Sequence, residues 1–231
     1  MAPPAGRALR LPAPHPDVTR LTNPRLPLLL PLALVFAPGV TTPAVGQTPW
    51  AVGFRVGAIG SSNLVRDSIV EPFAVRPQVA PLLGLRAIFP VGDRYLLGGQ
   101  VTVNRSDLRA VTDTSAATVT ALTVWAPSLV LRTAILAWLA AEARFGALLY
   151  DPATPEGTLF SDGSPVAAML GLGLALERPL TTSFRAALFL DYDAHRFTTT
   201  ALSERGFTGA TIVHRVAVGL SLTREFGHAA P

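Results

Sequence analysis

Residues 170–177 read LGLGLALE, with leucine at every even position and glycine, alanine or glutamate at every odd one. Successive side chains of a β-strand point to opposite faces, so this stretch predicts a strand with one apolar face and one face of small or charged residues. The same alternation recurs in seven other segments, at about 50–58, 75–89, 94–104, 117–132, 135–149, 184–193 and 212–221. The chain is therefore expected to be all-β.

The apolar faces of these segments carry no charged residue and are interrupted only by Gly99, Thr123 and His214. In a soluble, lipocalin-like barrel this face would point inward, and its many leucine, phenylalanine and tryptophan side chains would overfill an eight-stranded interior. The opposite face is rich in glycine and alanine and has only one or two charges per strand, which suits a narrow lumen. We therefore expect the apolar face to contact lipid.

Long and short links alternate between the segments. The long polar links are Ser61–Pro72, Ser106–Ala116, Asp151–Pro165 and Thr198–Gly209, and the short ones lie at Val91–Asp93, Thr133–Ala134 and Arg178–Thr182. Outer-membrane barrels have this rhythm, with long extracellular loops and short periplasmic turns. The sequence thus predicts an eight-stranded antiparallel up-and-down transmembrane β-barrel over residues 47–231, with both ends of the barrel chain in the periplasm.

Three prolines fall within the predicted strands and cannot donate hydrogen bonds to a closed barrel. Because Pro77 and Pro81 lie in the second segment, we expect its membrane span to be only Leu82–Pro90. Pro127, in the fourth segment, predicts a β-bulge.

The first 46 residues have the composition of a signal peptide. Arg25 precedes an apolar stretch, Leu26–Val40, and the small residues Ala44 and Gly46 stand at −3 and −1 of a cleavage site before Gln47. The region before Arg25 is long, so we expect the true translation start to lie downstream of Met1. An N-terminal membrane anchor is the alternative, and Pro27, Pro31 and Pro38 disfavour it.

The composition excludes several other classes of protein. The mean hydropathy is +0.41, yet no apolar run approaches the roughly 18 residues of a membrane helix. With no cysteine there is neither a disulfide nor a thiolate metal site, and no cofactor or metal motif is found. The leader has a net charge of +3, whereas residues 47–231 hold 15 arginines against 14 acids. The folded part therefore has no visible patch for nucleic acid.

The chain ends VAVGLSLTREF before a short tail, an amphipathic last strand that closes in an aromatic residue. Together with the leader and the loop rhythm, it resembles the small eight-stranded outer-membrane barrels of the outer-membrane protein A and X type. That resemblance implies outer-membrane lipid and lipopolysaccharide as surroundings, a monomer, and recognition by the barrel-assembly machinery through Val216, Val218, Leu220, Leu222 and Phe226. It implies a fold and a location, not a reaction.

Charged residues on the lumen face are candidates for an ion-pair network, because isolated charges in a narrow barrel are costly. They are Arg55, Arg76, Arg86, Glu142, Arg144, Glu177, Arg185, Asp191, Asp193 and Arg215. Asp191, Asp193 and His195 share one face near the predicted extracellular mouth and are weak candidates for a catalytic site. We expect a structural, adhesive or ligand-presenting protein that acts through four extracellular loops. A rim-located lipid or peptide hydrolase and a small channel are the alternatives.

Overall fold

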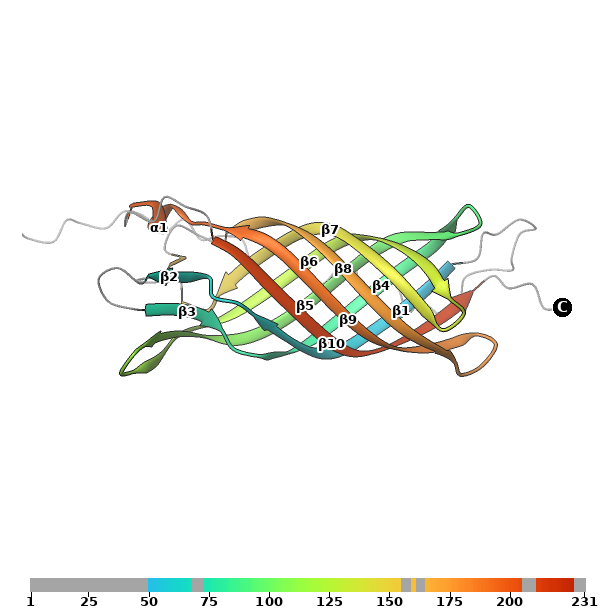
Figure 1. Ribbon diagram of the computed structural model, residues 1–231, viewed down its shortest axis with the longest axis horizontal. Coiled ribbons are helices and arrows are strands. Elements are labelled where there is room, and N and C mark those ends of the chain that lie inside the picture. The colour runs from blue at the N-terminus through green and yellow to red at the C-terminus, as the bar shows by residue number, and fades with distance from the viewer. Residues whose placement is uncertain (1–49, 68–72, 155–158, 161–164, 205–210, 227–231) are drawn as a thin grey trace, which may run out of the picture. The chain divides into compact units, whose positions relative to one another are not determined.

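The computed structural model describes residues 50–67, 73–154, 159–160, 165–204 and 211–226, and its strands form one antiparallel sheet that closes on itself. Eight strands form the ring (Figure 1): β1 (Trp50–Ser61), β4 (Ala80–Val91), β5 (Tyr95–Thr112), β6 (Ala116–Leu136), β7 (Leu139–Pro152), β8 (Val166–Pro179), β9 (Phe184–Phe197) and β10 (Thr211–Phe226). Each pairs with the next along the chain, and β10 returns to β1 through twelve residue pairs, Trp50↔Phe226 to Ser61↔Arg215. The predicted eight-stranded antiparallel barrel is confirmed.

The two faces of each strand have the predicted orientation. On β8 the even-numbered leucines, Leu170 to Leu176, are 45–65% exposed on the outside of the ring, whereas Gly171, Gly173 and Ala175 face the interior and are buried. The same holds around the ring, where large apolar side chains such as Phe54, Leu129, Phe145 and Leu220 cover the exterior. An apolar exterior around a closed ring is the arrangement that lipid requires, since closure leaves no unpaired sheet edge.

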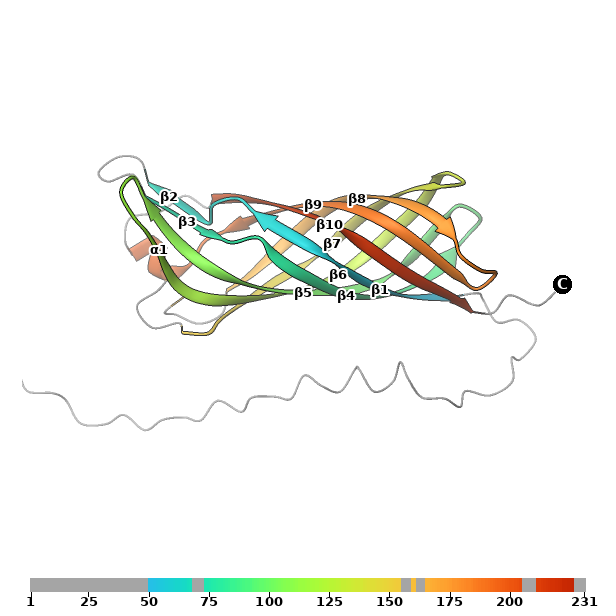
Figure 2. The same ribbon diagram turned by 90° about the horizontal axis from the view of Figure 1, so that it is seen from below.

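The two ends of the barrel differ. At the turn end lie Trp50, Phe226 and three short turns, the first of which uses Gly92 at a φ of 66°, a left-handed conformation that favours glycine. At the opposite end, which we call the outer end, lie the hairpin of β2 (Val65–Asp67) and β3 (Phe73–Pro77), the turn between β5 and β6, and the short helix α1 (Thr200–Glu204). In Figures 1 and 2, β2, β3 and α1 lie at one end of the barrel and the three short turns at the other. No helix among the described residues is long and apolar enough to cross a membrane.

Two of the predicted links are placed differently in the structure. The stretch Ser106–Ala116 is not a long loop, because β5 and β6 continue as a paired hairpin to a tight turn at 113–115. The short link predicted at Thr133–Ala134 lies at 137–138, so Ile135 belongs to β6 and not to the following strand. Along β5 the alternation of buried and exposed side chains continues past Ser106 as far as Arg109, whereas residues 134–136 at the end of β6 are all exposed. In both cases cross-strand pairing decides where the chain turns.

Pro77 and Pro127 have different effects on the sheet. The second strand is broken between Pro77 and Ala80, and the inward parity shifts there, so that Val75 faces inward in β3 whereas Leu82 does so in β4. Pro127 marks no bulge. The partners Trp125↔Leu149 and Ser128↔Gly146 keep one register across it, and only the pairing with β7 is interrupted. A proline can therefore stand in a closed ring at the cost of one ladder bond.

Candidate functional site

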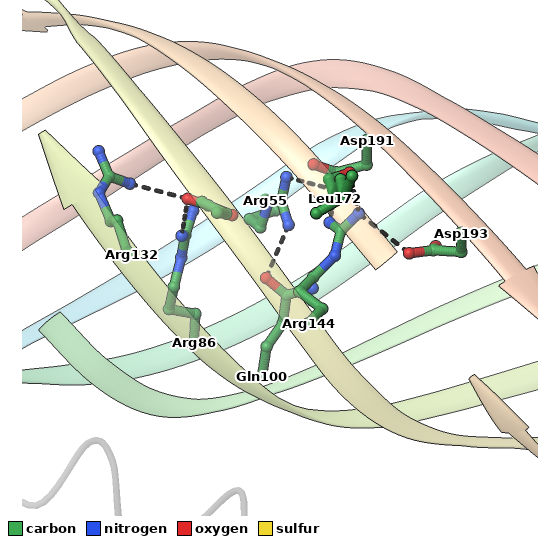
Figure 3. A network of polar contacts seen from close by, with 9 residues as sticks. Arg55, Arg86, Gln100, Arg132, Arg144, Leu172, Asp191 and Asp193 are labelled. Atoms are coloured by element: carbon green, nitrogen blue, oxygen red, sulfur yellow. Dashed lines mark hydrogen bonds and ion pairs between the residues drawn. The ribbon is translucent and has the colours of Figure 1, made fainter. Parts of the chain in front are cut away.

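The described charges of the lumen gather in its middle, in two groups of ion pairs. In the first group, Glu142 of β7 accepts a hydrogen bond from Arg86 of β4 at 2.5 Å and from Arg132 of β6 at 2.9 Å. Arg132 also pairs with Glu177 of β8. The contacts of Arg86 and Arg132 with Glu142 join β4 and β6 to β7 around one buried carboxylate (Figure 3).

Asp191 of β9 is the centre of the second group. It accepts from Arg55 of β1 at 2.7 Å and from Arg144 of β7, and Arg144 also donates to Asp193 at 3.0 Å. Figure 3 shows the Arg144 guanidinium between the two aspartates. Apart from Glu177, whose side chain is 15% exposed, the members of both groups are buried, so the attraction between opposite charges is little screened.

Arg55 is the most enclosed charge of the lumen, with a relative exposure of 0%. Besides Asp191 it donates to the Gln100 side chain at 2.6 Å and lies over the ring of Phe189, 3.7 Å from its centroid. A carboxylate, an amide oxygen and an aromatic face together replace the water that this guanidinium lost on folding.

Two glycines of β8 make room for the aspartates. Gly171 is the cross-strand partner of Asp193, and Gly173 is that of Asp191. A β-carbon on Gly173 would lie 2.6 Å from the Asp191 Oδ1, and one on Gly171 would overlap the Asp193 carboxylate. The glycine face of LGLGLALE therefore gives the aspartate side chains the space in which they reach Arg144.

A third polar layer lies nearer the outer end. The Tyr150 hydroxyl and the His195 Nε2 are 2.5 Å apart, and Arg215 donates to the Asn104 Oδ1 at 2.7 Å. All four side chains are buried. Asp193 is the cross-strand partner of Arg215, yet it forms its ion pair with Arg144.

Above this layer the lumen is apolar. A cluster of buried residues joins inward-facing strand positions to residues of the outer end; its members include Leu108, Leu122, Phe197, Val213, Leu64 and Phe160. Tyr150 belongs to it and contacts the rings of Phe160 and Phe197. This apolar plug was not expected from the sequence, where the inner face was interpreted as small or charged along its whole length.

The structure brings most of the sequence-predicted lumen residues together but not all of them. Arg185 lies nearer the turn end, partly exposed, where it pairs with Glu225 at 3.2 Å. It reaches the first group only through Glu177, at 4.0 Å. Arg76 was assigned to the lumen wrongly: it is exposed on β3, because the break in the second strand reverses the parity there. His195 is not at an open rim, because it is buried beneath the plug.

Sequence reasoning missed four partners, Arg132, Gln100, Asn104 and Tyr150. Gln100 and Asn104 have the inward parity of their strand but carry no charge, so a search for charges passes over them. Arg132 has the inward parity of β6 and stood at the end of the predicted segment. Tyr150 lies one residue beyond the predicted fifth segment, so only the longer observed strand reveals it.

The candidate catalytic side chains are engaged by neighbouring residues. Asp191 and Asp193 are held by arginines and His195 by a tyrosine, all of them buried. Among the described residues no group of histidine, aspartate and glutamate is placed to hold a metal ion. These contacts link strands of the ring through the lumen.

A closed ring with an apolar exterior and an ion-paired interior defines the small transmembrane β-barrels. No protein-family model and no curated protein matches the chain. Among solved structures, it is similar to the outer membrane protein AlkL in lipid bilayers, at 12% identity and a TM-score of 0.50, over 84% of this chain and 97% of that one. It is also similar to the outer membrane protein OprG from Pseudomonas aeruginosa (10%, 0.49, 79% and 97%) and to Neisserial surface protein A (10%, 0.44, 78% and 100%). The predicted resemblance to small outer-membrane barrels is confirmed at the level of the fold.

Proposed function

We propose that this chain is exported to the bacterial outer membrane and forms a barrel that does not conduct, with a structural, adhesive or ligand-presenting role at its outer end. The observation that carries the proposal is the double closure of the lumen. Ion pairs around Glu142 and Asp191 cross its middle, and the apolar plug fills its outer part. A hydrated path through the lumen would have to break buried ion pairs, so the closure does not support a small channel. The rim hydrolase lacks support for a separate reason, because Asp191, Asp193 and His195 are buried and held by other side chains.

The outer end supplies the surface for this role. Strands β5 and β6 have 18 and 21 residues, about twice the 9–11 residues that a tilted strand needs to span a bilayer. Their surplus forms a hairpin that projects beyond the ring, next to the β2–β3 hairpin that pairs with β5. Paired strands present side chains at fixed positions, which favours a defined binding surface over a flexible loop.

The proposal also names two partners of the protein, lipids and the barrel-assembly machinery. Val216, Val218, Leu220 and Leu222 form the exposed face of β10, and Phe226 stacks on Trp50 at 4.3 Å where β1 and β10 meet. We propose that this face carries the signal read by the barrel-assembly machinery and contacts lipid after insertion. The export signal at residues 1–46, with cleavage before Gln47, lies outside the described residues and is part of the same proposal.

Location and closure can be tested together. The chain has no cysteine, so one cysteine placed at Ser115, in the β5–β6 turn, should react with an impermeant reagent on intact cells. A cysteine at Asp93, in the turn between β4 and β5, should react only after the outer membrane is opened. The purified barrel in planar bilayers should give no stepwise current. The reverse labelling pattern would contradict the topology, and a steady conductance would contradict the closed lumen.

A further inference from the structure

An arginine patch lies on the exterior of the outer end and takes no part in the lumen network. It consists of Arg66 on β2, Arg76 on β3, and Arg105 and Arg109 on β5, and all four side chains are exposed. These strands are neighbours in one sheet, in the order β2, β3, β5. The patch is therefore assembled by pairing between segments that are up to about forty residues apart in sequence.

The register brings like charges face to face. Arg76 and Arg109 are direct cross-strand partners, and Arg66 pairs with Ala74, so it lies diagonally opposite Arg76. Side chains of direct partners have Cβ atoms about 5 Å apart, and like charges at this position destabilise a sheet. An arrangement that costs stability in the free protein is expected where a ligand offsets the repulsion.

No described carboxylate neutralises the patch by an ion pair. Asp107 shares its face and stands between Arg105 and Arg109 on β5, which leaves a net charge of +3 for the five residues, yet it lies within ion-pair distance of none of the arginines. With its amide oxygen turned toward Arg109, Gln78 accepts hydrogen bonds from that guanidinium. The patch thus differs from the lumen, where Arg55, Arg86, Arg132 and Arg144 each contact a carboxylate.

The patch begins where the apolar exterior ends. Along β5 the outward residues are first Val101 and Val103, and then Arg105, Asp107 and Arg109. After Arg76, Val79 faces outward between β3 and β4, and Pro81 faces outward in β4. With a rise of about 3.3 Å per residue and a tilt of about 40°, Arg109 lies about 10 Å further from the membrane centre than Arg105. The arginines therefore span the depth of a lipid headgroup directly above the hydrocarbon.

We propose that this patch binds the phosphate groups on the sugar headgroup of an outer-leaflet lipid. Guanidinium groups pair with phosphate through two parallel hydrogen bonds, and a lipid bearing two phosphates would bridge Arg76 and Arg109 and remove their repulsion. The acyl chains of the same lipid would lie against Val101, Val103 and Val79. This inference rests on the proposed outer-membrane location and adds to it the residues and the chemistry of lipid recognition.

The test compares two double variants in zwitterionic micelles. R76Q/R109Q removes the facing pair, and R94Q/R178Q makes the same charge change at exposed positions of the turn end. The probes are diphosphorylated lipid A, its dephosphorylated form, and inositol hexakisphosphate as a soluble polyphosphate. We expect R76Q/R109Q to weaken binding of diphosphorylated lipid A roughly 30-fold, since each arginine near an anionic surface contributes about fivefold. R94Q/R178Q should bind like the parent, and the dephosphorylated lipid should not distinguish the three proteins.

Equal loss in both variants would overturn the patch as a specific site, and so would a parent protein that binds the two lipid forms equally. Tighter binding of the soluble polyphosphate than of lipid A would overturn the lipid as its occupant. Heat-dependent migration of each sample shows that the barrel is folded. The cysteine labelling described above tests location independently, so a protein that passes it but fails the lipid test loses this proposal alone.

Discussion

Replacing Asp191 with asparagine should remove the largest single contribution to the lumen network. The change keeps the shape of the side chain and deletes its charge, so both Arg55 and Arg144 lose a carboxylate. Arg144 keeps Asp193, whereas Arg55 keeps only Gln100 and the face of Phe189. Breaking a buried pair by removing one partner costs about 3–5 kcal/mol, and we expect a loss of this size in the free energy of unfolding.

The loss in the free energy of unfolding depends on Arg55 being left without a carboxylate partner. A second substitution tests this. Arg55→Met keeps the length of the side chain and removes its charge, so the double variant D191N/R55M leaves no unpaired Arg55. We expect the double variant to recover at least about 2 kcal/mol relative to the sum of the two single variants. Asp113→Asn, in the exposed β5–β6 turn, is the matched control and should change stability by less than about 0.5 kcal/mol.

Urea unfolding in lipid vesicles, followed by the fluorescence of Trp50, Trp125 and Trp138, measures these differences. The three tryptophans lie on the exterior of the barrel, away from the substituted sites. A D191N variant as stable as the parent, with all arginines in place, would refute the view that the network is structural. Loss of an enzymatic activity with unchanged unfolding would instead favour a catalytic role for Asp191, Asp193 and His195.

Three further predictions concern other parts of the chain. Gly173→Ala should destabilise the barrel by about 1–3 kcal/mol because its β-carbon meets the Asp191 carboxylate, whereas Gly99→Ala, which meets nothing within 4 Å, should be neutral in the same unfolding assay. His195→Ala should cost about 1–3 kcal/mol because the buried Tyr150 hydroxyl loses its partner, and H195F/Y150F should restore much of this; an H195A variant that unfolds like the parent would contradict the contact. Intact mass of protein taken from membranes should place the mature N-terminus at Gln47, and retention of Leu26–Val40 would contradict cleavage.

The alternation of residues determines a large part of this fold. A period of two with uncharged apolar faces fixes which side of each strand meets lipid, because a one-residue shift would place charges in the hydrocarbon. The eight strands and the inward position of Asp191 and Asp193 follow from that pattern. So does the expectation of ion pairs, since charges on the inner face of a narrow barrel have no bulk water to solvate them.

The sequence alone could not determine which charged residues form ion pairs, because this depends on which strands face each other across the lumen. Arg144 could pair with several acids by its parity alone, and only the closed ring places it between Asp191 and Asp193. The exposed position of Arg76 has the same origin, because the break after Pro77 reverses the parity that the alternation predicts. The apolar plug forms where inward residues of four or more strands meet residues of the outer end. Local pattern determined which way each side chain points, and the shear and closure of the ring decided what it meets there.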